Sequence, residues 1–353
     1  MQGVILLQPI QVGLIGFGFS GSTFHAPVIT QVPGLNLTHV VSSDPSKVLR
    51  QLPQVEVLAD PRALWEHPDI ELVVITTPND THFPYAKEAL LSGKHVVIEK
   101  PFVVDVAEAD ELIKLAAEQN RILSVYHNRR YDSDFLTVKQ VIEQGLLGTV
   151  HTYEAHFDRY RPEVRIRWRE QDVPGAGVLY DLGPHLIDQA IQLFGPPQTV
   201  WADLLMQRPQ AQVTDCFHLI LGYENGLRAI LRAGCLVKAP GPRYQVHGSL
   251  GTLTKYGMDP QEEMLKQGMK PGDPGWGQES PEFQATLSTT VQGVELQSTV
   301  PTLTGGYERY YQQLAQAIRG QAEVPVSAQD ARQTMQVISA AITSAHEGRV
   351  VKI

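Results

Sequence analysis

Apolar runs of a few residues alternate with amphipathic stretches along the first third of the chain. In LVVIT (Leu72–Thr76) and HVVI (His95–Ile98) successive positions are apolar, which is typical of strands buried on both faces of a parallel sheet. Between such runs the pattern predicts helices, among them Val106–Asn120, with Asp105 as its N-cap and Glu108 at capping-box spacing. This alternation predicts an α/β fold with a doubly wound parallel sheet. The predicted elements are strands at Val12–Gly16, Thr38–Ser42, Leu72–Thr76, His95–Ile98 and Arg121–Tyr126, with helices at Tyr85–Ser92 and Val106–Asn120.

Beyond about residue 130 the pattern changes to alternating polar and apolar positions. Such alternation predicts strands with one covered face, in an open and largely antiparallel sheet. A helix at Phe135–Gln144 precedes these strands, and two helices close the chain, the second starting at Ser327 with Asp330 at position N3. The Gly- and Pro-rich segment Gly268–Pro281 is either an irregular surface loop or, less simply, a lid or subunit-contact arm. The predicted strands are Val150–Asp158, Thr199–Leu205, Cys216–Tyr223, Arg228–Val237, Tyr244–His247, Thr252–Tyr256 and Thr286–Val300.

Composition and charge narrow the classes of function. The 353 residues carry a formal net charge of -9, which argues against nucleic acid or an anionic membrane surface as a partner. The two cysteines, Cys216 and Cys235, have no zinc-site spacing, so we expect no metal. The N-terminal sequence MQGVILLQPIQVGLIGFG lacks a basic n-region and a cleavage site, and its apolar run is too short to span a bilayer. We therefore expect a cytoplasmic protein.

The motif GFGFSG follows the first predicted strand. It places Gly16, Gly18 and Gly21 in G-x-G-x-x-G spacing, with Phe19 and Ser20 inside the loop. Directly after a strand and before a helix, this spacing indicates a dinucleotide site. Gly16 permits a tight turn, Gly18 lets the backbone approach the pyrophosphate, and Gly21 lets the helix pack closely against the strand. We therefore expect a Rossmann domain that binds a dinucleotide at residues 1–128 and an α+β domain for substrate binding and oligomerisation at 129–353.

The end of the second strand bears on the choice between NAD and NADP. Ser42 and Ser43 stand where NAD-binding sites usually carry an acidic residue. Two small hydroxyls leave room for a 2′-phosphate, which Lys47 or Arg50 could neutralise. Asp44 precedes a proline and suits a helix N-cap. These residues favour NADP; if Asp44 points at the ribose instead, NAD is the cofactor.

Three polar segments follow predicted strands, at the edge of the sheet where ligands bind in such folds. They are TTPNDTH (76–82), EKP (99–101) and YHNRR (126–130). Lys100 thus lies at the active crevice, and the Lys100–Pro101 bond is a candidate cis peptide; the simpler interpretation is a surface lysine paired with Glu99. The residues expected to border the cofactor here are Thr77, Pro78, Asn79, His82, Glu99, Lys100 and Asn128.

The segment PGAGVLYDLGPHLIDQ supplies a second polar cluster, with Asp181 and His185 four residues apart. Pro184 suits the first turn of a helix with Gly183 near its N-cap, which puts His185 at the helix start within reach of Asp181. Alone, the segment would be an amphipathic helix with one satisfied histidine. Beside a nicotinamide site, it suits hydride transfer from a secondary alcohol: His185 as base, Asp181 orienting it, and Lys100 polarising the substrate oxygen in place of a metal.

Together the motifs GFGFSG, TTPNDTH, VVIEKP and GVLYDLGPHLID resemble the glucose–fructose oxidoreductase/inositol dehydrogenase (Gfo/Idh/MocA) family over nearly the whole chain. The resemblance implies a catalytic triad of Lys100, Asp181 and His185, and a C-terminal open sheet used in homodimer or homotetramer contacts. GSTFHAP, SVYHNRRYDSDFLT, RYRPEVRIRWRE and GPRYQVHG resemble the branch of NADP-dependent scyllo-inositol dehydrogenases. That branch implies that Tyr160 and Arg167 border a polyhydroxylated substrate; ion pairing at the domain interface is the alternative for the arginines.

Three functions therefore stand at this point. The first is an NADP-dependent dehydrogenase acting on CH–OH groups of a polyol, with inositol favoured and another sugar as the nearest alternative. The second is a non-enzymatic regulator on the same fold, and the third is a sugar-binding protein without turnover. The presence of Lys100, Asp181 and His185 favours the first.

Overall fold

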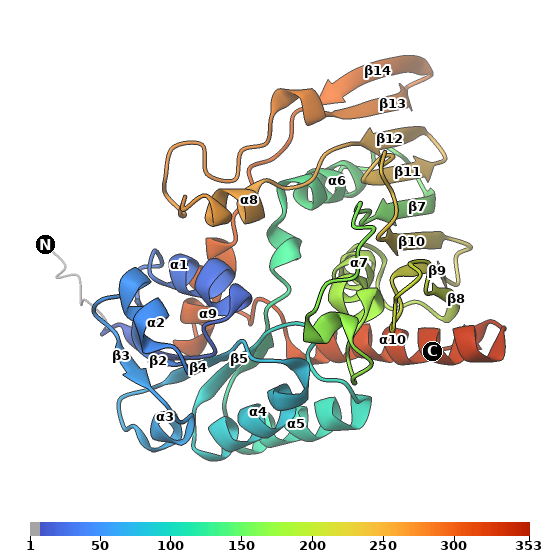
Figure 1. Ribbon diagram of the computed structural model, residues 1–353. Coiled ribbons are helices and arrows are strands. Elements are labelled where there is room, and N and C mark those ends of the chain that lie inside the picture. Colours follow the sequence, from blue (N-terminus) through green and yellow to red (C-terminus); the bar gives the residue numbers. More distant parts are fainter. Residues whose placement is uncertain (1–7) are drawn as a thin grey trace, which may run out of the picture.

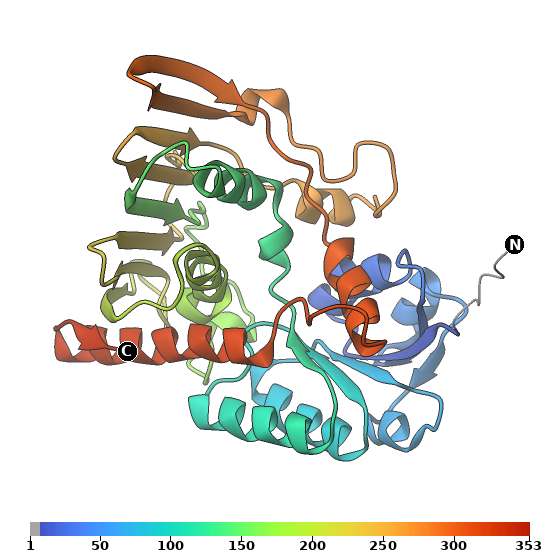
Figure 2. The same cartoon turned by 180° about the vertical axis from the view of Figure 1, so that it is seen from behind.

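The computed structural model describes residues 8–353, and Figures 1 and 2 show two sheets, the first with helices on both faces and the second with helices on one face. Most of the apolar N-terminal run, residues 1–7, lies outside the described residues, so the interpretation of that run stays a prediction. Among the described residues, no helix is long and apolar enough to cross a membrane.

The first sheet is the predicted doubly wound one. Its six strands are all parallel and run in the order β3-β2-β1-β4-β5-β6, which is the Rossmann order. The pattern missed the short edge strand β3, because only three residues pair there and none is fully buried. The strands are β1 (Ile10–Ile15), β2 (Leu35–Val41), β3 (Glu56–Leu58), β4 (Leu72–Ile75), β5 (His95–Ile98) and β6 (Leu123–Val125).

Helices cover both faces of this sheet (Figure 1). Asp105 caps α5 by accepting a hydrogen bond from the Ala107 amide, and Asp44 caps α2 by accepting one from the Lys47 amide, both as predicted. The helix predicted from Tyr85 begins three residues earlier, at His82. The helices are α1 (Ala26–Ile29), α2 (Pro45–Gln51), α3 (Arg62–Glu66), α4 (His82–Leu91) and α5 (Val106–Glu118).

The second sheet has nine strands in the order β14-β13-β12-β11-β7-β10-β9-β8-β15. Only the pair β7 and β10 is parallel, so the prediction of a largely antiparallel sheet is confirmed. Helices α6 and α7 cover one face, and no described helix covers the other (Figure 2). The strands are β7 (Val150–His156), β8 (Thr199–Leu205), β9 (Cys216–Gly222), β10 (Arg228–Gly234), β11 (Tyr244–Gly248), β12 (Gly251–Lys255), β13 (Ala285–Val291), β14 (Val294–Val300) and β15 (Val351–Lys352).

The prediction of one continuous strand at Thr286–Val300 is wrong. The segment is a hairpin of β13 and β14, which turns at Gln292 and Gly293, both with positive φ. Positive φ at both central residues defines a turn for which Asn-Gly or Asp-Gly is the usual signature. Gln-Gly lacks that signature, so the alternation of polar and apolar positions gave no indication of a turn at these two residues.

The last helices return to the first sheet. Helix α9 packs against α1, and the long helix α10 packs against α5, α7 and β8 (Figure 2). The Ser327 hydroxyl accepts a hydrogen bond from the Asp330 amide at the start of α10, as predicted. These helices join the two halves of the chain, and the division at residue 128 remains a proposal. The helices of the second half are α6 (Ser133–Glu143), α7 (Val178–Phe194), α8 (Gln261–Lys266), α9 (Glu308–Ile318) and α10 (Ala328–Glu347).

Candidate active site

The glycine loop after β1 has the shape that a pyrophosphate requires. Gly16 adopts a φ of 91°, and a Cβ at Gly21 would overlap the carbonyl oxygen of Gly16. A Cβ at Gly18 would meet no atom within 4 Å, so this backbone faces open space. The helix that follows begins at Phe19 and is π-helical at 21–25 before it continues as α1. This loop therefore fits the phosphates of a dinucleotide.

A buried carboxylate, Glu99, ties this loop to the end of β5. Its Oε1 accepts hydrogen bonds from the Ser20 hydroxyl and from Nε2 of His25, the latter at 2.9 Å. Its Oε2 accepts from the backbone N–H of Lys100 at 2.9 Å. Burial raises the pKa of Glu99, but the hydrogen bond and charge of His25 and the charge of Lys100 outweigh it and hold the pKa at about 2. The alternative of a simple surface pair between Lys100 and Glu99 is wrong, because Glu99 contacts the lysine backbone rather than its ammonium.

Lys100 points across the crevice to the second half of the chain. Its ammonium donates to the backbone oxygen of Asp181 at 2.7 Å and to Oδ1 of Asp181 at 3.3 Å. Burial lowers the pKa of Lys100, and the Asp181 charge opposes that shift. The Lys100–Pro101 peptide is cis, as the sequence suggested.

Asp181 lies in the first turn of α7, which begins earlier than the sequence indicated. The helix starts at Val178, with Gly177 as its N-cap, so the prediction of a start near Pro184 is wrong. Pro184 lies inside the helix, and the preceding Gly183 has no Cβ to clash with the proline ring. Asp181 and His185 therefore lie one turn apart on the same face of one helix.

The Asp181 carboxylate is surrounded by cations. Beside Lys100 it pairs with Arg159 at 3.4 Å and with Arg169 at 3.7 Å. Burial raises the pKa of Asp181, but the charges of Lys100, Arg159 and Arg169 outweigh burial and hold the pKa well below its usual value. Asp181 is thus a carboxylate at neutral pH.

His185 is buried, with 5% of its surface exposed, and stacks against Phe157 with ring centroids 6.4 Å apart. Its Nδ1 has no hydrogen-bond partner among the described residues. The expectation that Asp181 orients this ring by a direct contact is therefore not met, because the carboxylate turns toward the three cations. Burial, followed by the charges of Lys100 and Arg129, lowers the pKa of His185 well below 6.5. The imidazole is neutral at physiological pH and can accept a proton.

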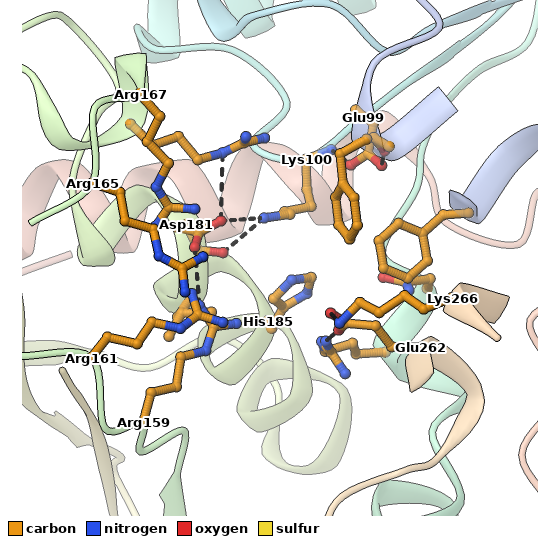
Figure 3. Close-up of a pocket in the computed structure, with 17 residues that line it drawn as sticks. Glu99, Lys100, Arg159, Arg161, Arg165, Arg167, Asp181, His185, Glu262 and Lys266 are labelled. Atoms are coloured by element: carbon orange, nitrogen blue, oxygen red, sulfur yellow. Dashed lines mark hydrogen bonds and ion pairs between the residues drawn. The ribbon is translucent and has the colours of Figure 1, made fainter. Parts of the chain in front are cut away.

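These residues border a cavity of about 340 Å³ between the two sheets, within the size range of small-ligand pockets (Figure 3). The structure brings eight of the predicted site residues to this cavity. They are Phe19, Ser20, Glu99, Lys100, Asn128, Arg167, Asp181 and His185.

Several other predicted residues have different roles. Tyr160 does not line the cavity: it is 51% exposed and forms a bridge to Leu236, because the chain turns outward after β7. His82 is fully buried, and its two ring nitrogens contact the carbonyls of Pro101 at 2.9 Å and Thr77 at 3.0 Å. Asn79 donates to the Gly175 carbonyl at 2.9 Å. Asn79 and His82 therefore hold the strand-end loops in place.

The predicted 2′-phosphate site lies at the end of β2, away from the cavity. The Asp44 carboxylate accepts hydrogen bonds from the Ser46 hydroxyl at 2.7 Å and from the Lys47 amide at 3.0 Å, so it serves as the predicted N-cap. The Lys47 ammonium donates to the Phe17 carbonyl at 2.7 Å. Ser42 accepts a hydrogen bond from the Asp44 amide at 3.1 Å.

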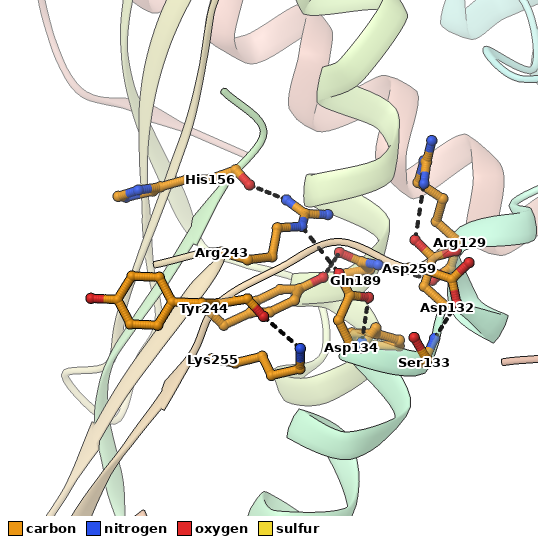
Figure 4. Close-up of polar contacts among 12 residues, drawn as sticks. Arg129, Asp132, Ser133, Asp134, His156, Gln189, Arg243, Tyr244, Lys255 and Asp259 are labelled. Atoms are coloured by element: carbon orange, nitrogen blue, oxygen red, sulfur yellow. Dashed lines mark hydrogen bonds and ion pairs between the residues drawn. The ribbon is translucent and has the colours of Figure 1, made fainter. Parts of the chain in front are cut away.

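A buried polar network links the start of α6, helix α7 and the second sheet (Figure 4). Arg129 donates to Asp132 at 3.1 Å and to Glu262 of α8 at 2.7 Å. The amide of Gln189 on α7 donates to the Arg129 carbonyl at 2.9 Å, and Tyr244 of β11 donates to Gln189 at 2.9 Å. This network fixes α7, and with it Asp181 and His185, against the second sheet.

The sequence did not single out several residues that line the cavity. Phe24 lies on the π-helical turn, and Glu262 and Lys266 come from α8, a helix that the pattern did not predict. Only folding brings α8 to the glycine loop, where the Lys266 ammonium lies 5.8 Å from the Phe19 ring centroid. The high density of arginines in RYRPEVRIRWRE did indicate that this segment borders the substrate, although Arg167 was the one arginine predicted there. The further arginines at the cavity are Arg129, Arg159, Arg161, Arg165 and Arg169.

Comparison with known proteins assigns the chain to a family. Its residues 10–127 match the NAD-binding Rossmann fold of the Gfo/Idh/MocA oxidoreductase family, and residues 139–353 match the C-terminal alpha/beta domain of that family. The chain therefore belongs to the Gfo/Idh/MocA family of oxidoreductases.

Relatives align over almost their whole length. The chain is 50% identical to the uncharacterized oxidoreductase YdgJ of Escherichia coli, covering 95% of this chain and 96% of YdgJ. It is 41% identical to IolW of Bacillus subtilis, a scyllo-inositol 2-dehydrogenase (NADP(+)), covering 100% of this chain and 98% of IolW. The solved structure of YvaA from Bacillus subtilis superimposes with a TM-score of 0.95 at 41% identity, covering 98% of this chain and 99% of YvaA.

Proposed function

We propose that this protein is an NADP-dependent dehydrogenase that transfers a hydride between a secondary alcohol of a polyol or sugar and the nicotinamide. The observation that carries the proposal is the meeting of Lys100, from the first sheet, with Asp181 and His185, from α7, at one cavity beside the glycine loop. Scyllo-inositol is the first substrate to test, because the chain is 41% identical to IolW, named a scyllo-inositol 2-dehydrogenase.

Each of the three side chains has a separate task in this mechanism. When bound, the nicotinamide supplies the hydride acceptor. His185 is neutral and takes the hydroxyl proton, while Lys100 donates a hydrogen bond to the substrate oxygen and stabilises the developing alkoxide. Asp181 holds the Lys100 ammonium in position. The hydroxyl proton passes to His185, the hydride leaves the carbon that bears this hydroxyl, and the alcohol becomes a ketone.

Two features support NADP as the cofactor. The Asp44 carboxylate caps α2 through its Oδ1, which is the role predicted for it where the cofactor is NADP. Ser42 and Ser43 are small, and Lys47 lies close enough to the loop to contact the Phe17 carbonyl. Gly16, Gly18, Phe19, Ser20 and Gly21 would hold the pyrophosphate. We further propose that the enzyme works in the cytoplasm as a homodimer or homotetramer joined through the uncovered face of the second sheet.

The test is nicotinamide absorbance of the purified protein with scyllo-inositol or myo-inositol, using NADP and NAD in separate reactions. We expect NADP to be reduced with scyllo-inositol. Lys100→Met should lower kcat by at least about 10²-fold, the typical cost of removing one electrostatic stabiliser, and should leave NADPH binding intact. Lys87→Met removes an exposed ammonium paired with Glu111 and serves as the matched control.

Two results would contradict the proposal. Equal rates for Lys100→Met and the unaltered protein would remove the proposed catalytic role. NADPH binding without oxidation of inositols, sugars or their acids would favour a regulator on the same fold.

A further inference from the structure

The cavity carries far more positive charge than a neutral polyol needs. Its walls hold eight cationic side chains and three carboxylates, although the chain as a whole has a net charge of -9. Four of the arginines come from residues 161–169, and Figure 3 shows Arg161 and Arg165 beside Asp181, across the cavity from Lys266.

Most of these cations already have a carboxylate partner. Arg159 and Arg169, like Lys100, share the single carboxylate of Asp181, at 3.4 and 3.7 Å. Arg167 pairs with Glu170 at 2.8 Å.

On the opposite wall the cations are paired too. Arg129 and Lys266 both bind Glu262, at 2.7 Å each. Arg129 also contacts the carboxyl group of Asp132, at 3.1 Å. Both cations of that wall therefore have a carboxylate partner.

Arg161 and Arg165 are different. Among residues 8–353, neither guanidinium has a hydrogen-bond acceptor or a salt-bridge partner, and both line the cavity. Their backbones are held in place: the Arg165 amide donates to Glu170 at 3.0 Å, and the Arg161 amide donates to the Cys235 carbonyl at 2.7 Å. Arg161 is half-buried and Arg165 is exposed, so both guanidiniums reach the cavity from an anchored segment without an acceptor among the described residues.

The neighbouring charges also favour an incoming anion. Burial, and after it the charges of Arg161 and Arg129, lowers the pKa of Arg159 despite its pair with Asp181. Cations so close together repel one another, and an anion between them removes that repulsion.

The anions of the cofactor do not account for these arginines. The pyrophosphate belongs at the glycine loop, whereas Arg161 and Arg165 belong to the segment after β7 that lines the Asp181 side. The proposed 2′-phosphate site lies farther away, at the end of β2. The remaining source of a negative charge in this cavity is the substrate.

We infer that Arg161 and Arg165 bind an oxyanion carried by the substrate, so that the preferred substrate is a polyhydroxylated compound with a carboxylate or phosphate group. This inference rests on the proposed function and narrows its substrate class. Guanidinium groups suit both anions, because their paired N–H donors match two oxygens of either group.

Binding to the complex with NADPH tests the inference without turnover, since an alcohol cannot reduce a cofactor that is already reduced. Calorimetry would compare D-gluconate, a carboxylate without an aldehyde that NADPH could reduce, with myo-inositol 1-phosphate as the phosphate and myo-inositol as the neutral polyol. We expect at least one anion to bind about 10-fold or more tightly than myo-inositol, as charge-assisted hydrogen bonds predict. The advantage should shrink as salt is raised, because salt screens exposed charges.

Alanine variants test whether the two arginines bind the anion. Arg161→Ala and Arg165→Ala should each weaken binding of the preferred anion by about 10-fold, and should change myo-inositol binding by less than about 3-fold. Arg228→Ala is the matched control, because this arginine is the first residue of β10, does not line the cavity, and donates hydrogen bonds to the carbonyls of Gly226 and Leu227.

The outcomes separate this inference from the proposed function. Equal affinities for anionic and neutral compounds would overturn the inference and leave the dehydrogenase proposal standing. Arginine variants that weaken NADPH rather than the anion would also overturn it, since the arginines would then serve the cofactor. Tight binding of the anion that is lost in both variants supports the inference even if no alcohol is oxidised, and the missing oxidation would then count against the proposed function alone.

Discussion

Asp181 and His185 lie one helical turn apart, yet their side chains have opposite surroundings. The Asp181 carboxylate contacts three cations, and its pKa falls below the usual range. The His185 ring is buried among Lys100, Arg129 and Arg243 without a carboxylate contact, and its pKa falls as well. One residue is therefore held as an anion and the other as a neutral imidazole, which are the protonation states that the proposed alcohol oxidation requires.

The lowered pKa of His185 predicts the pH dependence of catalysis. A base works only when it is unprotonated, so a pKa below 6.5 keeps His185 active at mildly acidic pH. We expect the acid limb of the kcat/KM profile for alcohol oxidation to have its midpoint below 6.5. His185→Gln should remove that limb and most of the activity, whereas His151→Gln, an exposed histidine of β7, should preserve both. An acid limb at or above pH 7 would contradict the role of His185.

At the scale of elements, two glycines of the loop between β1 and α1 have different surroundings. Gly21 has no room for a Cβ, because the carbonyl of Gly16 occupies that space. Gly18 has room for one within this protein, and only a bound ligand would fill it. Gly21 is therefore required by the packing of the loop itself, whereas Gly18 is not, which agrees with its proposed place at the cofactor.

This difference predicts distinct effects of two alanine substitutions. Gly21→Ala should lower the melting temperature of the ligand-free protein, because the loop or helix must shift to relieve the overlap. Gly18→Ala should leave that temperature within about 1 °C and weaken NADPH binding by about 10-fold or more, as a methyl group at a phosphate cradle blocks close approach. Thermal unfolding and NADPH titration of both variants measure the effects. Equal losses of stability would show that Gly18 is also required by the fold.

The hydrophobic pattern of the sequence identified most helices and strands. It misplaced a helix end where a tertiary contact determines that end. Helix α7 was expected to begin at Pro184, a residue that favours a first turn. It begins at Val178, whose amide donates to the Thr214 carbonyl at 2.7 Å. This contact with a distant segment anchors the helix start, so no local signal could reveal it.

At the scale of the whole molecule, Arg130 connects three segments that are far apart in the sequence. It donates to Asp188 of α7 at 2.6 and 2.8 Å and to Asp330 of α10 at 3.2 Å. Both Arg130 and Asp188 are almost fully buried. This cluster joins the β6 strand end to the helix that carries Asp181 and His185.

Loss of this cluster should destabilise the protein strongly. Arg130→Met leaves the Asp188 charge buried without its partner, and removing one partner of a buried pair typically costs about 3–5 kcal/mol. Arg332 lies on α10, as Asp330 does, and its pair with Asp110 is exposed. Arg332→Met should therefore lower the free energy of unfolding several-fold less than Arg130→Met. Urea denaturation followed by fluorescence measures both midpoints. Similar shifts for the two variants would mean that Arg130 does not join the segments energetically.

The sequence by itself determined the parallel first sheet, the largely antiparallel second sheet, the glycine loop and the caps at Asp44, Asp105 and Ser327. These features depend on periodicity or on residues close together in the chain, so the sequence predicts them without the fold. The prediction that Lys100 acts together with Asp181 and His185 rested on the chemistry of these residues and on the family resemblance of their motifs. Only the tertiary structure decided which charges meet. Lys100 and Asp181 are 81 positions apart, and Arg130 and Asp330 are 200 apart. Because electrostatic pairing depends on distance in space, the sequence could name these groups but could not show that Asp181 turns to Lys100 and the arginines instead of His185. Nor could it show that Arg161 and Arg165 have no partner within residues 8–353.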